Sequence, residues 1–165
     1  MKRREKDEPK QLINSGNIIH YLALSVIFAA VIFGVKMVVL GALAASPTKQ
    51  AGNGIISLFE VHNTGAAFNL FSAQPEVVIS FSFIALAALI FVAFVFSTKL
   101  SKSAISSMAL LTAGIAMNFY ERVTQGFVID YIHLDFMQNF PVFNTADIMI
   151  VCGALGIVIA LLTKD

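Results

Sequence analysis

Residues 18–43 have the sequence IIHYLALSVIFAAVIFGVKMVVLGAL, in which Lys36 is the only charged residue. A helix needs about 20 mostly apolar residues to cross the hydrocarbon core of a bilayer. This run is long enough, and it therefore predicts a membrane-spanning helix. Further spans are predicted at 77–96, 104–120 and 146–162. The third of the four runs is the least apolar, because several serine, threonine and asparagine residues interrupt it.

The composition of the whole chain supports a membrane protein. Hydrophobic residues make up 58% of the 165 residues and charged residues 13%, against roughly 45–50% and 25% in soluble domains. So few charges cannot cover the surface of a small soluble domain, and so many apolar residues exclude a disordered chain. A net charge of +1 provides no basic field for nucleic acid. The single cysteine, Cys152, excludes a disulfide framework.

The positions of lysine and arginine predict the orientation of the helices. If both termini are cytoplasmic, the cytoplasmic segments hold Lys2, Arg3, Arg4, Lys6, Lys10, Lys99, Lys102 and Lys164. The two opposite loops then hold only Lys49 and Arg122. Cytoplasmic loops carry the positive excess, so this orientation is favoured. We expect residues 1–16 to form a cytoplasmic tail and residues 17–165 a single integral-membrane domain, and the first apolar run is too long for a cleaved signal peptide.

Two segments outside the predicted spans, 44–76 and 121–145, are too apolar for free loops. Residues 55–61 have a strand-like pattern and precede the turn signal Asn63-Thr64-Gly65, and residues 127–136 are also strand-like. The predicted fold is therefore an α-helical polytopic membrane protein. It has four transmembrane helices and a small extracytoplasmic β-sheet formed by the two outer loops.

The polar residues that topology does not explain fall at one face of the predicted bundle. Lys36 lies about 18 residues into the first span, close to the outer interface at 1.5 Å per residue. The other positions at this level are Asn118, Arg122 and Asp147 at helix ends, with Asn63, Gly65, Asp130 and Asp135 in the outer loops. Ionisable groups buried in membrane proteins are costly and usually mark function. The pattern predicts a functional site at the outer face.

Asp130 is the most informative of these residues. In a strand, alternate residues share a face, so Asp130 would be the single polar member of a face shared with Val128, Ile132, Leu134 and Phe136. Burial on such a face raises the pKa of a carboxyl group. A structural carboxylate bonded to a loop explains Asp130 taken alone equally well.

Asp147 lies in the first turn of the fourth predicted helix, where the helix dipole favours a charged carboxylate. Taken alone, Asp147 is better explained as part of a helix cap, with Asn144 or Thr145 at the capping position. Together, however, one neutral and one ionised carboxyl are what acid–base hydrolysis by an activated water requires. The ionised group would take a proton from the water, and the neutral group would protonate the peptide carbonyl oxygen.

Other chemistries have weaker support in the sequence. The three histidines, His20, His62 and His133, are scattered and show no zinc-binding spacing. A serine–lysine pair between Lys36 and either Ser57 or Ser72 has no local signature, and no glycine-rich phosphate loop is present. Cys152 is predicted to be a small core residue of the fourth helix.

The chain resembles the lipoprotein signal peptidases, the type II signal peptidases of bacteria. The matching segments are VHNTGAAF at 61–68, NFYER at 118–122, VIDY at 128–131 and FNTAD at 143–147. Their order, their spacing and the four-helix setting agree over residues 18–162. The first and last of these segments are specific when they occur together.

The resemblance implies an aspartic endopeptidase of the bacterial inner membrane. Such enzymes cut the signal peptide from a prolipoprotein just before a cysteine that carries a diacylglyceryl group, and Asp130 and Asp147 would be the catalytic dyad. Roles in binding or supporting the substrate fall to Asn63, Gly65, Asn118, Arg122, Asn144 and Lys36. The resemblance also implies an outer β-cradle, with no metal ion and no organic cofactor. The expected partners are the prolipoprotein and membrane lipid, and we expect a monomer.

Three positions depart from the family pattern. The family usually has Asp in place of Ile32, Gly in place of Met117 and Asp in place of Glu121. Neither predicted catalytic aspartate is affected, so we expect an active but divergent enzyme. A catalytically silent relative that binds lipidated peptides is the alternative. A small four-helix transporter fits less well, because transporters place their charges near the bilayer midplane.

Overall fold

The computed structural model describes residues 13–46, 51–52, 54–66, 70–71, 73–137 and 139–163. Its helices are α1 (Ser15–Ala45), α2 (Pro75–Val95), α3 (Lys102–Gln125) and α4 (Thr145–Thr163). Its strands are β1 (Ala51–Gly52), β2 (Ile56–Asn63) and β3 (Val128–Leu134). All four helices are long and apolar enough to cross a membrane, which confirms the predicted fold class. Residues 1–12 of the predicted tail lie outside the described residues.

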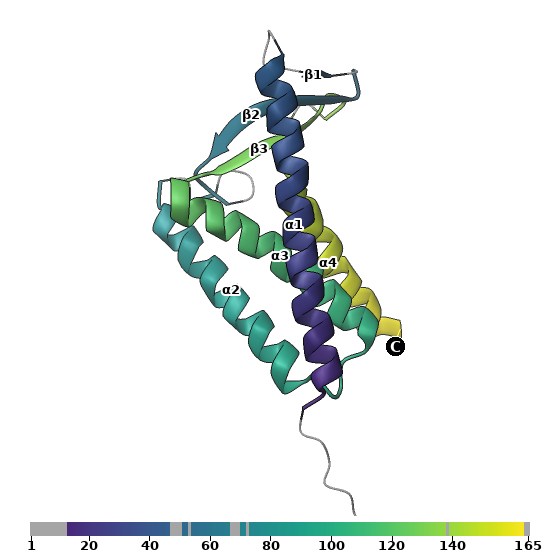
Figure 1. Cartoon of the computed structure of the whole chain (residues 1–165). Helices are drawn as coiled ribbons and strands as arrows, with labels where there is room; N and C mark the ends of the chain where they lie inside the picture. The colour runs from purple at the N-terminus through teal and green to yellow at the C-terminus, as the bar shows by residue number, and fades with distance from the viewer. Residues whose placement is uncertain are drawn as a thin grey trace, which may run out of the picture.

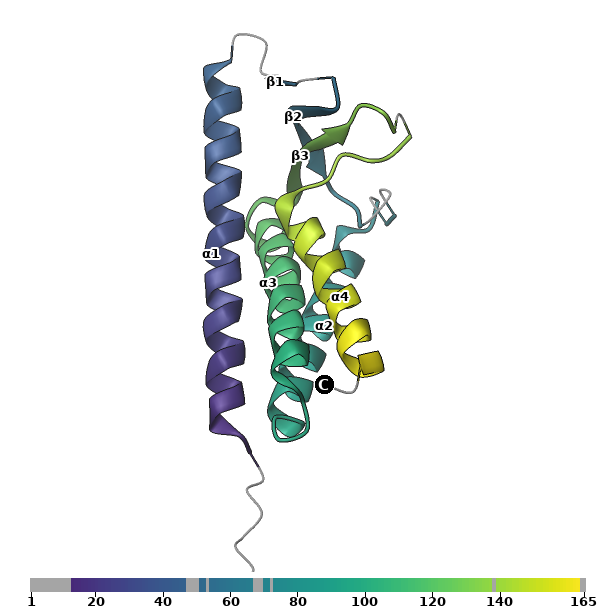
Figure 2. The ribbon, with the colours of Figure 1, turned by 90° about the vertical axis from the view of Figure 1, so that its right-hand side faces the viewer.

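Helix α3 is the centre of the bundle. It contacts α1, α2 and α4, and Figures 1 and 2 show it running between them. Its buried residues include Ile105, Met108 and Ala109, which form a core cluster with Tyr21 of α1 and Ala93 of α2. The other three helices expose long apolar faces. The most polar of the four spans is thus the one that protein surrounds, while the others present apolar side chains outward, as a lipid environment requires.

Helices α3 and α4 approach each other through glycine. A Cβ atom added at Gly114 would lie 2.6 Å from the carbonyl oxygen of Ala146, and one added at Gly153 would lie 2.5 Å from the backbone nitrogen of Leu111. Small residues let two membrane helices pack with their backbones in contact. This contact fixes where α4 begins relative to α3.

The sheet lies at one end of the bundle, beyond the end of α3 and the start of α4 (Figure 1). Its strand order is β1-β2-β3, and both pairings are antiparallel. The two predicted strands are confirmed as β2 and β3, whereas β1 was not predicted. The register pairs Val61 with Asp130 and Asn63 with Val128. Asn63 is therefore a diagonal neighbour of Asp130 on the same face of the sheet.

The ends of α3 differ from the prediction in a way that matters for the site. The helix begins after Ser101, whose hydroxyl accepts a hydrogen bond from the backbone N–H of Ala104, as is typical of a helix cap. It ends at Gly126, whose φ of 83° suits a glycine that closes a helix. The predicted span stopped at residue 120. The additional turn brings Glu121 and Arg122 into the helix and turns both inward, where they are buried.

Candidate active site

Asp130 is held on β3 by two asparagine side chains. Its residue exposure is 2%. The Nδ2 atom of Asn63 donates to its Oδ2 atom at 2.9 Å, and the Nδ2 atom of Asn144 donates to its Oδ1 atom at 2.7 Å. These donors come from β2 and from the residue that precedes α4. Both carboxyl oxygens are thus oriented by neutral amides.

The electrostatic environment of Asp130 favours its neutral form. Burial raises the pKa of this carboxyl from its ordinary value of 3.8 to about 6, and the negative charge of Asp147 adds to the increase. The hydrogen bonds from Asn63 and Asn144 and the positive charge of Arg122 act in the opposite direction and only partly offset the burial. A protonated Asp130 is therefore accessible close to neutral pH.

Asp147 is part of a reciprocal cap at the start of α4. Its backbone N–H donates to Oδ1 of Asn144 at 3.1 Å, and its Oδ2 accepts from the backbone N–H of Asn144 at 3.0 Å. This is the geometry of a capping box. Its other oxygen, Oδ1, accepts from Nδ2 of Asn118 on α3 at 2.8 Å. The cap and the interhelical bond together fix the direction of the carboxylate.

Asn144 joins the two aspartates into one network. Its Nδ2 atom donates to Asp130 and also lies 3.2 Å from Oδ1 of Asn118, while its Oδ1 accepts from the backbone of Asp147. Asn118 in turn donates to Asp147. The carboxyls that the sequence separates by 17 residues therefore share Asn144 as a hydrogen-bonding partner. Capping is thus only part of what Asp147 does in the fold.

Arg122 and Gly65 support the network from the side. The Nη2 atom of Arg122 donates to the carbonyl oxygen of Gly65 at 2.6 Å, and the backbone N–H of Gly65 donates to Oδ1 of Asn63 at 2.9 Å. These bonds orient the amide of Asn63 toward Asp130. The guanidinium is buried, and its Nε atom has no hydrogen-bond partner among the described residues.

A cavity of about 950 Å³ opens beside the network. Asp130 and Asp147 both line it, together with Asn63, Asn118 and Arg122. The predicted alternation on β3 holds for Val128, Asp130 and Leu134, which all face this cavity. The remaining walls are mostly apolar and come from β2, α2, α3, the segment before α4, and α4 itself: Val61, Ala66, Val78, Ile115, Phe140, Pro141, Val142, Phe143, Ile148, Ile150 and Val151.

Lys36 lies elsewhere. Its Nζ atom forms an ion pair of 2.6 Å with Oε1 of Glu121, both side chains are largely buried, and neither residue lines the cavity. In the sequence, Glu121 stands out only as a departure from the family pattern. A signal for its role was present, because an acidic residue near the carboxyl end of a helix opposes the helix dipole and needs a partner.

Cys152, Ile32 and Met117 lie outside the hydrogen-bonded network of the aspartates. Cys152 is exposed and lines the cavity, so its prediction as a core residue was wrong. The error arose because α4 has a wide outward face and only Ala146, Gly153 and Ala160 are buried along it. Ile32 belongs to the apolar cluster between α1, α3 and α4, and Met117 packs against that cluster. Both departures from the family pattern therefore lie outside the cavity wall.

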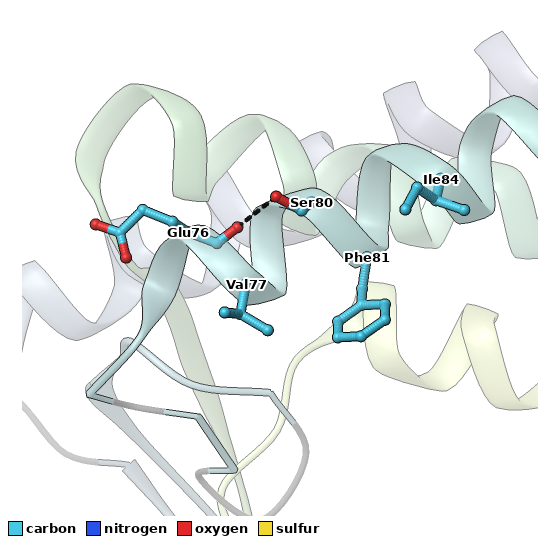
Figure 3. A pocket seen from close by; sticks show the side chains of 5 residues that line it. All are labelled: Glu76, Val77, Ser80, Phe81 and Ile84. Carbon is cyan, nitrogen blue, oxygen red and sulfur yellow. Dashed lines mark hydrogen bonds between the residues drawn. The ribbon is translucent and has the colours of Figure 1, made fainter.

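A second hollow, of about 320 Å³, lies on the surface of α2. Figure 3 shows its residues, Glu76, Val77, Ser80, Phe81 and Ile84, along one side of the helix. Its one drawn hydrogen bond runs from the Ser80 hydroxyl to the backbone oxygen of Glu76 and is internal to the helix. The hollow lacks convergent polar groups, so the larger cavity is the candidate for the functional site.

Comparison with known proteins identifies the family. A family model described as signal peptidase (SPase) II matches residues 18–163. The chain belongs to the signal peptidase II family. It is therefore related to proteases of the membrane.

Relatives of this signal peptidase II chain cover most of its length. A protein named lipoprotein signal peptidase from Buchnera aphidicola is 39% identical over 115 residues, which are 67% of this chain and 73% of the relative. One of the same name from Lactiplantibacillus plantarum is 30% identical over 145 residues, or 88% of this chain and 95% of the relative. A solved bacterial membrane enzyme, 25% identical, superimposes with a TM-score of 0.71 over 87% of this chain and 88% of its own.

Proposed function

We propose that this protein is a membrane aspartic endopeptidase that removes signal peptides from diacylglyceryl-modified prolipoproteins. Membership of the signal peptidase II family supports the reaction class, and the names of the relatives support the substrate class. The observation that carries the proposal is the pairing of Asp130 and Asp147 through Asn144 and Asn118 on the wall of one cavity.

In the proposed mechanism the two aspartates divide the proton transfers. Asp147, at the start of α4, takes a proton from a water molecule as the water oxygen attacks the carbonyl carbon of the scissile peptide bond. Asp130 enters neutral and gives its proton to the carbonyl oxygen, which produces a tetrahedral diol. The C–N bond then breaks: the proton held by Asp147 passes to the leaving nitrogen, and Asp130 recovers a proton from the diol.

The other residues of the network bind the substrate and hold the dyad in this mechanism. Asn63 and Asn144 each donate to one oxygen of Asp130. The proton of neutral Asp130 would therefore occupy a lone-pair position that neither amide uses. Arg122 lines the cavity and would orient the backbone of the extended substrate there. Lys36 would contribute indirectly, since it contacts Glu121 and is absent from the cavity wall.

The apolar part of the cavity suits a lipid-modified cysteine. Val78 of α2 and Ile148 and Val151 of α4 belong to the apolar part of the cavity wall. A diacylglyceryl group could enter between these helices from the bilayer. Its acyl chains would then remain in apolar surroundings while the peptide bond reaches the carboxyls.

We infer that the sheet end of the bundle faces outward from the bacterial inner membrane, that both termini are cytoplasmic and that the protein acts as a monomer. Lys99 lies in the turn between α2 and α3 and Lys102 is the first residue of α3, at the end of the bundle away from the sheet. Positive residues mark the cytoplasmic side. No metal ion or cofactor is assigned to the reaction.

The proposal is tested by cleavage of a purified precursor with and without the diacylglyceryl group. We expect the wild-type protein to cut only the modified precursor, and Asp130→Asn and Asp147→Asn each to lower the rate by at least ~10³-fold while the protein stays folded. An amide cannot perform the proton transfers of the carboxyl it replaces. A single Asn variant that processes the precursor at the normal rate would show that the dyad is wrongly assigned.

The same assay distinguishes the alternative of a silent relative. Such a protein would retain the lipidated precursor in a pull-down and give no product at any pH. Both aspartates line the cavity, and Ile32 and Met117 lie outside it. We therefore expect product.

A further inference from the structure

Glu121 connects three elements of the fold beside the aspartates. Its exposure is 7%. Oε1 accepts the ion pair from Lys36 of α1 at 2.6 Å. Oε2 accepts from the backbone N–H of Ile129 in β3 at 2.9 Å and from Nε2 of Gln125 at 3.1 Å. One carboxylate on α3 thus links the first helix, the central helix and the strand that carries Asp130.

The hydrogen bond to Ile129 is made directly beside Asp130 in β3. Ile129 and Tyr131 flank Asp130 on β3. The N–H of Ile129 is bonded to Glu121, and the N–H of Tyr131 is bonded to the carbonyl oxygen of Phe143 at 3.0 Å. The backbone is therefore fixed on both sides of Asp130, once by the segment that leads into α4 and once by a side chain of α3.

The ion pair makes this anchor stiff. A buried carboxylate without a counter-charge costs several kcal/mol and would turn toward water or take up a proton. Lys36 supplies the counter-charge from α1 and leaves Oε2 directed at β3. The carboxylate contacts both partners at the same time, because Oε1 binds Lys36 and Oε2 accepts from Ile129.

We propose that Glu121 is a positioning residue for the reaction: through the N–H of Ile129 it sets the place of Asp130 relative to Asp147, and Lys36 holds Glu121 in that role. The inference rests on the proposed function for its kinetic consequence. A catalytic group displaced by about 1 Å loses on the order of 10²-fold in rate. Neither Glu121 nor Lys36 lines the cavity, so substrate binding should change much less than turnover.

Two double variants isolate the hydrogen bond from the ion pair. Lys36→Met combined with Glu121→Gln removes both charges and keeps an oxygen that accepts from Ile129. Lys36→Met combined with Glu121→Leu removes both charges and the acceptor at similar volume. The glutamine also places an amide N–H against an apolar methionine, which costs free energy. Any advantage of the glutamine variant is therefore gained against this cost.

We expect the leucine variant to have a kcat at least ~10-fold below that of the glutamine variant, with KM within about twofold between them. The two variants should have similar melting temperatures in detergent. Equal kcat values in the two variants, or a difference that appears in KM alone, would overturn the proposal. Should the leucine variant not be recovered folded, Glu121→Met with Lys36→Met gives the same comparison with a more adaptable side chain.

A second readout does not depend on cleavage. Amide hydrogen exchange of the segment 128–134 should be faster in the leucine variant than in the glutamine variant, because only the former lacks an acceptor for Ile129. Unchanged exchange would overturn the anchor. If the wild-type protein fails to cleave while exchange differs as expected, the anchor stands and the proposed function falls.

Discussion

At the scale of single residues, the side chain of Asn144 is fully used. Its Nδ2 atom donates to Asp130 and Asn118, and its Oδ1 atom caps the helix that carries Asp147. Aspartate at this position could not donate, and serine could not reach both carboxyls. A neutral amide can donate to a carboxyl group whether that group is protonated or ionised. It therefore orients both aspartates and still lets each of them gain or lose a proton.

The pKa of Asp130 gives a prediction for the pH dependence of the enzyme. Burial raises the pKa of this carboxyl to about 6, and its protonated form is the one that the mechanism uses. Because kcat/KM reports the free enzyme, it should fall as pH rises above about 6 and approach a tenfold loss per pH unit. The measurement is kcat/KM for a lipidated precursor between about pH 5 and 9.

A matched control for this pH profile is Asp135→Asn. Asp135 follows β3 and does not line the cavity. The variant should reproduce the wild-type profile. A wild-type kcat/KM that stays constant through this range would contradict the neutral role of Asp130.

Sequence patterns predicted the aspartates better than their surroundings. Asp130 stood out because it interrupts an apolar alternation, and Asp147 because it follows a capping residue. The contacts of Asn118 and Arg122 depend on how α3 packs against α4 and the loop at Gly65. No local pattern carries that information, and their roles were taken from the resemblance. Sequence patterns did not indicate the partner of Glu121, because its ion pair joins residues that are 85 positions apart on two different helices.

At the scale of elements, the helices and strands followed from length and alternation, and the errors lie at their ends. Helix α3 continues through Gln125, with Glu121 and Arg122 buried and Glu121 bonded to β3, although its composition becomes polar after residue 120. Gly126 was a usable stop signal. Strand β1 has only two residues, which is too short for any alternation to show.

The close contact of α3 with α4 makes Gly114→Ala informative. The added methyl group would lie 2.6 Å from the carbonyl oxygen of Ala146 and 2.7 Å from Cγ1 of Ile150, so the start of α4 must shift. We expect a loss of about 1–3 kcal/mol in stability and at least a ~10-fold loss in kcat, since Asp147 moves with α4. Thermal unfolding in detergent and precursor cleavage measure the two effects.

The matched control is Gly34→Ala on α1. A Cβ atom there meets nothing within 4 Å. It should leave cleavage unchanged and, from helix propensity, stabilise by up to about 1 kcal/mol. If both alanine variants behave alike, the glycine contact does not position α4.

At the scale of the whole molecule, all the proposed chemistry lies at the sheet end, and Lys99 and Lys102 lie at the other. This separation predicts the result of labelling intact cells in a Cys152→Ser background. A cysteine at exposed Phe136 should react with a membrane-impermeant maleimide, and a cysteine at exposed Lys102 should react only after the cells are lysed. The reverse pattern would place the aspartates on the cytoplasmic side and contradict the proposed orientation.

The central place of α3 also bears on how the chain enters the membrane during synthesis. Helices α1 and α2 leave the ribosome first, and their apolar surfaces allow each to settle in lipid alone. Helix α3 brings Asn118, Glu121 and Arg122, which lipid by itself would reject. We therefore expect α3 to insert more readily once Lys36 of α1 is in the membrane, so that the ion pair of the folded protein also assists its assembly.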